Sequence, residues 1–148
     1  MDQIDTKLLK LLSQNADTTA TMLAGAVHMS VPAVNKRLAR LRESGVIRNY
    51  TLRLDPEKIA KPVVGFALLV LNQQKNLDRL LTYVNSEPDI VEFHAVTGEY
   101  DYIAKIYARD IRDFENKLLR LKQQEGVTKS NTIFSLLEYK TLPGPLPD

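Results

Sequence analysis

The sequence predicts an α+β protein with two domains, a three-helix, winged helix-turn-helix domain followed by a βαββαβ domain. Three observations favour this fold class. Residues 20–45 carry two helical patterns joined by a three-residue turn, a third amphipathic pattern precedes them, and strands begin to alternate with helices after residue 61. We therefore expect a first domain over 1–50, an extended linker over 51–61, a second domain over 62–141 and a flexible tail over 142–148.

The second helix of the pair has the clearest boundaries. Ser30 is a suitable N-cap, Pro32 lies in the first turn where its missing N–H costs nothing, and Gly45 provides the left-handed residue after the helix. One apolar stripe follows the helical period and consists of Val34, Leu38 and Leu41. These features predict a helix over about residues 31–44.

Two further helices should complete the first core. The first member of the pair is predicted over residues 20–27, with Leu23, Ala24 and Val27 turned inward. Upstream, Asp2 is a plausible cap for an amphipathic helix rich in leucine. Three such helices can enclose a small apolar core.

Positive charge is concentrated around the second helix of the pair. Residues 1–61 hold ten Lys and Arg against six Asp and Glu, whereas residues 62–148 hold ten against twelve, so a net charge of only +2 hides a polarised chain. Between residues 28 and 54, six basic side chains are opposed by Glu43 alone. A cationic helix face is often only solvated surface, but this density of charge favours a phosphate-bearing partner, and we expect double-stranded DNA.

Helical angle suggests a role for each outward side chain in a DNA groove. Lys36, Arg37 and Arg40 with Ala33 are best placed for base edges, Ser30 and Arg48 for phosphates, and Asn35 shares the outward surface. Phosphate contacts position a protein without specifying sequence. An architectural protein with little sequence selectivity is therefore the alternative to a sequence-specific regulator.

The second domain should form a ferredoxin-like, four-stranded antiparallel sheet with both helices on one face. Residues 66–70 are apolar on both faces of the first strand, and a face that lacks helices needs another cover. A second copy of the sheet is the simplest cover, so we expect at least a dimer, with an N-terminal domain folded over the sheet as the alternative. The predicted elements are strands at 63–71, 90–96, 102–107 and 132–139, and helices at 77–85 and 111–121.

The turn between the two middle strands carries more polar groups than a bend requires. Gly98 provides the positive φ, but Thr97, Glu99, Tyr100 and Asp101 surround it. Hydroxyls, backbone N–H groups and a carboxylate could hold the ammonium and carboxylate of a free amino acid, although a solvated hairpin has the same pattern.

Composition argues against catalysis. The chain has no cysteine, its two histidines, His28 and His94, fall in different predicted domains, and it has no Gly-rich phosphate loop or metal-binding motif. We expect no metal, no cofactor and no enzyme activity, and keep a small-molecule enzyme on the ferredoxin-like fold as a rival. The first residues lack the pattern of a signal peptide, and the longest apolar run is about half of a membrane span, so we expect a cytoplasmic protein.

With these residues in view, the chain resembles the leucine-responsive and asparagine-operon (Lrp/AsnC) transcription regulators over about residues 1–141. The resemblance is carried by IDTKLLKLLSQNA, by LAGAVHMSVPAVNKRLARLRESGVIRNYT, and by HAVTGEYDYIAKI followed by LLEYK. His28 stands where the motif's turn usually has glycine, so we expect His28 to adopt left-handed torsions.

The resemblance implies a DNA-binding regulator whose second domain forms dimers, tetramers, octamers or larger rings and binds an amino-acid effector between dimers. It implies that Thr97, Gly98, Tyr100 and Asp101 line the pocket. A neighbouring subunit would then contribute Thr132, Phe134 and Ser135 from the last strand.

Overall fold

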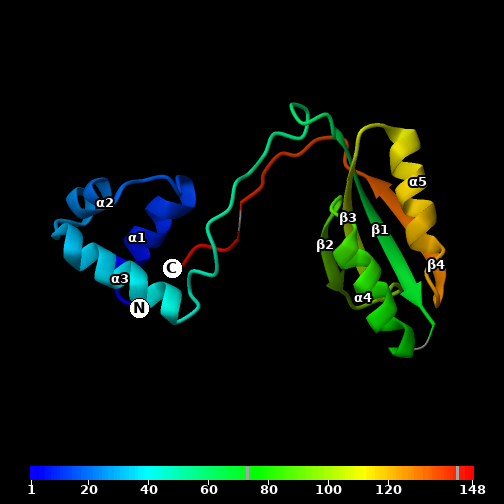
Figure 1. The fold of residues 1–148 in the computed structure, drawn as a ribbon, viewed down its shortest axis with the longest axis horizontal. Helices are drawn as coiled ribbons and strands as arrows, with labels where there is room; N and C mark the ends of the chain where they lie inside the picture. The colour runs from blue at the N-terminus through cyan, green and yellow to red at the C-terminus, as the bar shows by residue number, and fades with distance from the viewer. Residues whose placement is uncertain (73, 143) are drawn as a thin grey trace. The chain divides into compact units, whose positions relative to one another are not determined.

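The computed structural model describes residues 1–72, 74–142 and 144–148 (Figure 1). The chain divides into two compact units, one formed by Met1–Arg53 with Lys140–Asp148 and the other by Leu54–Tyr139. Each unit has its own apolar core.

The first unit contains the three predicted helices, α1 (Gln3–Gln14), α2 (Ala20–Val27) and α3 (Val31–Glu43). Their apolar faces meet in one buried cluster, so the helix-turn-helix prediction is confirmed. The cluster consists of Leu8, Leu23, Ala24, Val27, Val34, Leu38 and Leu41.

Caps fix where these helices begin and end. The Asp2 carboxylate accepts the backbone N–H of Asp5 while the Asp5 carboxylate accepts the backbone N–H of Asp2, which makes a reciprocal capping box at α1. His28 adopts φ 54° and ψ 46°, the predicted left-handed conformation, and so turns the chain between α2 and α3. Gly45 follows α3 with φ 74°, as its position predicted.

The second unit is the predicted ferredoxin-like βαββαβ fold. All strand pairs are antiparallel, and the order across the sheet is β2-β3-β1-β4. A short 3-10 turn (Gln74–Asn76) leads into the first helix. The elements are β1 (Val63–Leu71), α4 (Leu77–Ser86), β2 (Ile90–Ala95), β3 (Tyr102–Ala108), α5 (Ile111–Lys122) and β4 (Val127–Phe134).

Both helices of this unit pack on the same face of the sheet. Ala67 and Leu69 of β1 are buried beneath Leu80 of α4 and Phe114 of α5. Gly65 lies where a Cβ atom would come 2.5 Å from the Phe114 ring, so its missing side chain makes room for that ring. The close packing of α5 on β1 therefore depends on this glycine.

The opposite face of the sheet carries apolar residues along β1, with Lys105 of β3 directly opposite Phe66 and ion-paired with Glu92. Alternate β1 residues are only half-buried there, and Ile133 of β4 is 54% exposed. Directly opposed residues share a face in an antiparallel sheet, and the register opposes Phe66 to Ile133 and Leu68 to Ile103. This apolar surface, which we call the open face, consists of Val64, Phe66, Leu68, Val70, Ile103 and Ile133.

The predicted last strand, 132–139, is wrong, because β4 runs over Val127–Phe134. Polar side chains such as Thr128, Lys129 and Asn131 form an edge strand paired with β1, and their exposure explains why they lack an alternating apolar pattern. Leu136 and Leu137, whose apolar character suggested a strand, are exposed residues beyond it.

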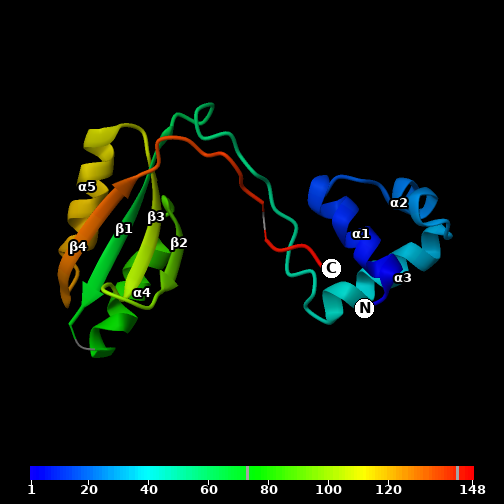
Figure 2. The ribbon, with the colours of Figure 1, turned by 180° about the vertical axis from the view of Figure 1, so that it is seen from behind.

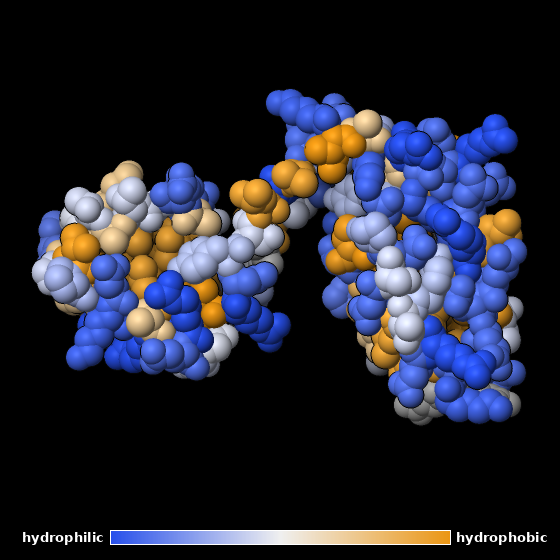
Figure 3. All heavy atoms as spheres, in the orientation of Figure 1, coloured by the Kyte–Doolittle hydropathy of each residue, from blue (hydrophilic) through white to orange (hydrophobic). Residues whose placement is uncertain are grey.

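The segment after α3 has no strand in residues 46–62. Within the first unit, the Arg53 guanidinium donates a hydrogen bond to the carbonyl oxygen of Thr141 at 3.2 Å. Figures 1 and 2 show the course of these segments, and Figure 3 shows apolar patches at the surface. Leu52, Leu136 and Leu137 of these segments are exposed.

Candidate DNA-binding and effector-binding sites

Helix α3 presents a polar surface opposite its buried stripe. The Ser30 hydroxyl accepts the backbone N–H of Ala33 at 3.4 Å, which satisfies a donor of the first turn. The residues that we predicted to contact DNA thus lie on one helix, except Arg48, which lies beyond its end. Of the predicted set, Ser30, Asn35, Lys36, Arg40 and Arg48 are exposed, whereas Ala33 and Arg37 are half-buried.

Arg37 is engaged by two carboxylates of α1 and its cap. Its Nη1 atom lies 2.6 Å from Asp2 Oδ2 and 2.8 Å from Asp5 Oδ1, and its side chain is 21% exposed. Arg40 also donates to Asp5, with Nη2 2.8 Å from Oδ2, but keeps 60% of its side chain exposed. The Asp5 side chain is fully buried.

These contacts shift the ionisation of the groups involved. The Asp5 backbone N–H, followed by the Arg37 guanidinium, lowers the pKa of Asp2. Burial raises the pKa of Asp5. The Asp2 backbone N–H, Arg37 and Arg40 together lower it by more than burial raises it, so the pKa of Asp5 lies below its ordinary value. The carboxylates of Asp2 and then Asp5 raise the pKa of Arg37. All of these groups are charged near neutral pH.

The energies involved bear on whether Arg37 can reach a base. A hydrogen bond to a charged group contributes about 1.5–3 kcal/mol, and a good base contact contributes about 1–3 kcal/mol. If Arg37 left the carboxylates to bind a base, the net change in free energy would therefore be small. Lys36, Arg42 and Arg48 form no side-chain ion pair within residues 1–72, 74–142 and 144–148, so they face no such competition.

The Arg37 contacts were missed at the sequence level. The cap at Asp2 was predicted, but its partner on α3 lies 35 residues away. Two acids three residues apart at a helix start would have indicated a capping box, yet only the packing of α1 on α3 brings Arg37 to them.

The β2–β3 turn is fixed by backbone hydrogen bonds. The Val96 N–H donates to the Asp101 carbonyl oxygen at 2.8 Å, and the Asp101 N–H donates to the Leu69 carbonyl oxygen at 2.9 Å. The Asp101 carboxylate accepts the Leu71 N–H at 2.9 Å, and Gly98 has φ 119°. Asp101 thus holds the turn against the end of β1, with Thr97, Gly98 and Tyr100 on the loop.

Two charged residues beside this turn were not predicted as site residues. Lys129 of β4 is ion-paired with Glu99 of the turn, and its Nζ lies 5.0 Å from the centroid of the Tyr100 ring. The hydrogen bond that the Lys129 ammonium donates to the Glu99 carboxylate is the main reason why the pKa of Lys129 is raised. This pair could have been found only from the register that places the start of β4 beside the turn.

The other predicted effector residues lie towards the far end of β4. The Phe134 ring packs on Phe114 with centroids 4.7 Å apart, and the Ser135 N–H donates to the Val64 carbonyl oxygen at 2.9 Å. Thr132 pairs with Ala67 in the middle of the sheet. One subunit therefore does not bring Thr132, Phe134 and Ser135 to its own β2–β3 turn.

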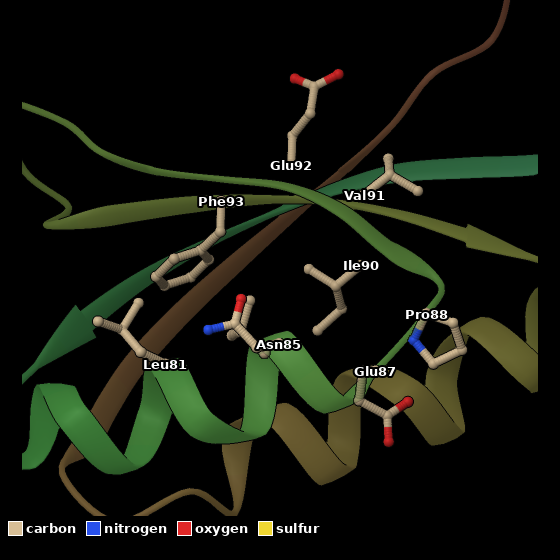
Figure 4. A pocket seen from close by; sticks show the side chains of 9 residues that line it. Leu81, Asn85, Glu87, Pro88, Ile90, Val91, Glu92 and Phe93 are labelled. Atoms are coloured by element: carbon tan, nitrogen blue, oxygen red, sulfur yellow. The ribbon is translucent and has the colours of Figure 1, made fainter. Parts of the chain in front are cut away.

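A shallow pocket of about 360 Å³ lies between α4 and the edge strand β2 (Figure 4). Ile90 and Phe93 point towards Leu81 and Asn85 of α4, whereas Glu92 points away. No residue that the sequence predicted for effector binding lines this pocket.

Among the residues that the structure describes, no helix is long and apolar enough to cross a membrane. No group of three or more His, Cys, Asp or Glu side chains there is arranged to hold a metal ion.

A helix-turn-helix unit joined to a ferredoxin-like unit defines a class of DNA-binding transcription regulator that carries a ligand-binding domain. Comparison with known families agrees with this class. Residues 1–48 match the winged helix-turn-helix DNA-binding family, and residues 65–145 match the Lrp/AsnC ligand binding domain. The chain belongs to the Lrp/AsnC family, as the sequence resemblance indicated.

Individual relatives agree over almost the full chain. The glutamate uptake regulatory protein of Zymomonas mobilis is 31% identical over 142 residues, covering 95% of this chain and 87% of the relative. The DNA-binding transcriptional activator DecR of Escherichia coli is 30% identical over 143 residues, covering 95% and 94%. A transcriptional regulator of Neisseria meningitidis, solved in complex with L-Met, has a TM-score of 0.93 and 26% identity, covering 97% of this chain and 94% of that one.

These relatives are transcription regulators, which supports the expectation that this protein is not an enzyme. The protein is a DNA-binding transcription regulator with a domain for a small effector.

Proposed function

We propose that the protein is a homo-oligomeric regulator in which an amino acid changes the assembly and so the affinity for DNA. The observation that carries this proposal is the pairing of a helix-turn-helix unit with a sheet unit of the Lrp/AsnC ligand-binding family. The L-Met bound to the Neisseria relative supports an amino acid as the effector class. Because its DNA partner lies inside the cell, we place the protein in the cytoplasm.

The outward surface of α3 is the proposed DNA contact. Lys36 and Ala33 face a base edge, Arg40 uses its exposed donors, and Ser30 and Arg48 contact phosphates. Asn35 flanks this surface. Helical angle also predicts a base contact for Arg37, but its ion pairs with Asp2 and Asp5 compete with that role.

The open face of the sheet is the proposed dimer interface. An apolar patch in the middle of a sheet is covered in most proteins, and a second copy covers it by two-fold symmetry. Two linked recognition helices then contact two half-sites, which gives the dimer a higher affinity than either helix alone.

The effector is proposed to bind at the β2–β3 turn, where Thr97, Gly98, Tyr100 and Asp101 supply hydroxyl and backbone groups. Thr132, Phe134 and Ser135 would come from a neighbouring subunit, since the sheet register keeps them away from this turn within one protomer. Such a site couples effector binding to assembly, because it is complete only where two subunits meet.

The full-length protein tests this proposal. Its mass by light scattering and its affinity for a duplex selected from a random pool are measured with each of the twenty amino acids. We expect at least one amino acid to change the mass or the affinity by several-fold, as allosteric coupling of about 1–3 kcal/mol implies. If neither quantity changes with any amino acid, the effector proposal fails.

The dimer interface is tested separately by Ile133→Glu. A charge buried within an apolar interface costs several kcal/mol, so we expect a monomer by light scattering. Met22→Glu, at an exposed apolar position of α2, is the matched control and should keep the wild-type mass. If Ile133→Glu also keeps it, the open face is not the interface.

A further inference from the structure

The side chains of α3 are not equally available to a partner. Each residue advances a helix by about 100°, so Lys36 lies nearly opposite the buried Val34 and Leu38, whereas Arg37 lies beside that stripe, next to α1. The structure agrees, since Lys36 is exposed and Arg37 is mostly covered.

The contact of Asp5 with Arg37 and Arg40 is not an ordinary exposed ion pair. Its fully buried carboxylate is bonded at both oxygens, by Arg37 at Oδ1 and by Arg40 with the Asp2 backbone N–H at Oδ2. Asp2 adds a second carboxylate to the same Arg37 nitrogen. If Arg37 moved to DNA, it would leave a buried carboxylate with one charged donor fewer.

We propose that Asp2 and Asp5 form an acidic clamp that withholds Arg37 from DNA. Arg37 is then a positioning residue, which fixes the angle of α3 against α1. Sequence is read chiefly by Lys36, which the clamp leaves free, and by the guanidinium donors of Arg40 that Asp5 does not engage. This inference rests on the proposed function, because it assumes that α3 enters the DNA groove.

The clamp also reduces the charge presented to phosphates. The carboxylates of Asp2 and Asp5 offset the positive charge of Arg37 and Arg40, which weakens the attraction of α3 for any duplex, irrespective of sequence. Asp5 therefore lowers non-specific binding while it positions the helix, and its removal should strengthen binding to random DNA.

The test measures affinity for a selected duplex and for random duplex DNA over a range of salt concentrations, with the full-length protein. Each lost phosphate contact reduces the slope of log affinity against log salt by about 0.9. Lys36→Gln, the matched control from the free surface, is expected to weaken the selected complex by about tenfold or to lower the slope. Arg37→Gln is expected to keep the wild-type slope, because on this proposal Arg37 makes no DNA contact, although the altered angle of α3 weakens the selected complex.

Asp5→Asn gives the opposite and more diagnostic result. It removes one of the two carboxylates that hold Arg37 and the carboxylate partner of Arg40, so we expect a steeper salt slope and several-fold tighter binding to random DNA. The double variant D5N/R37Q should lose this gain, which a merely structural role of Asp5 would not predict. If Asp5→Asn lowers the folded fraction at 25 °C, Asp2→Asn replaces it, because Asp2 is half-exposed and its loss leaves Asp5 in place.

Failure of the clamp and failure of the proposed DNA-binding function give different results. If Arg37→Gln lowers the salt slope by about 0.9, Arg37 contacts DNA directly and the clamp is wrong. The clamp is also wrong if D5N/R37Q binds random DNA as tightly as Asp5→Asn does. A wild-type protein that binds no duplex at low salt overturns the proposed function itself.

Discussion

The two units hold their candidate site residues in place by different forces. In the first unit, helix α3 is tied to α1 by ion pairs from Arg37 and Arg40 to the buried Asp5. In the second unit, the β2–β3 turn is tied to β1 by backbone hydrogen bonds and by the carboxylate of Asp101. The orientation of α3 therefore depends on specific side chains, whereas the position of the turn depends mainly on sheet register.

This difference predicts different responses to mutation. A change at Asp5 should alter stability and DNA binding together, because one carboxylate serves both. Exposed side chains of the turn should be replaceable with little loss of stability, so their effects on the effector can be measured in a folded protein.

The largest expected effect follows Asp5→Ala. The substitution removes half of a capping box, worth about 1 kcal/mol, and hydrogen bonds to two guanidinium groups, so the first unit should lose about 2–4 kcal/mol of unfolding free energy. Hydrogen exchange of the Leu8 and Leu38 amides measures this unit, and the Ala67 amide measures the other. Asp17→Ala, in the exposed α1–α2 loop, is the control and should change stability by less than about 0.5 kcal/mol.

The pH dependence of stability tests the same role of Asp5. The pKa values of Asp2 and Asp5 are lower in the folded protein than their ordinary value of 3.8, so these groups stabilise the fold above that pH. The stabilisation is lost as pH falls through the folded pKa. The difference between wild type and Asp5→Ala should therefore shrink in acid, and a difference that persists there would show that the ion pairs do not hold the first unit.

A glycine-to-alanine substitution is expected to change stability by a smaller amount, and with opposite sign in the two units. Gly65→Ala places a Cβ atom 2.5 Å from the Phe114 ring, and overpacking of this kind costs about 1–3 kcal/mol. Gly25→Ala in the exposed helix α2 meets nothing within 4 Å and should stabilise by about 0.5–1 kcal/mol through helix propensity. Thermal unfolding of both variants measures the contrast, and equal signs would contradict it.

Much of the fold could be predicted because its signals are local. Caps at Asp2 and Ser30, the left-handed His28 and the apolar run of β1 each depend on neighbours in the chain, and the structure has them where the patterns placed them. The boundaries of β4 could not be predicted in this way. It is a polar edge strand, whose identity comes from pairing with β1 rather than from its own composition.

The site was predictable to a similar extent. Helical angle identified the polar surface of α3, but it could not show that Arg37 is held by α1, because that contact depends on how two helices pack. Likewise the turn was identified by its residues, whereas Lys129 was missed because only strand register brings it beside Glu99. The assignment of DNA-contacting and effector-contacting residues stays a prediction.

The smallest effect on stability should come from Lys129→Gln. This variant tests directly whether the β2–β3 turn, unlike α3, keeps its position without its charged side chains. The Lys129 and Glu99 side chains are both exposed, and exposed ion pairs contribute about 0–1 kcal/mol, so thermal unfolding should change by little. If the effector is an amino acid held at this turn, the variant removes a cation that contacts Glu99 and Tyr100 of the turn, and the affinity for the effector identified by the screen should fall several-fold. Lys122→Gln, at an exposed position on α5, is the control for charge alone. Equal effector affinity in both variants would mean that Lys129 does not contribute to the site, whereas a large loss of stability would show that the turn, like α3, is held in place by its charged side chains.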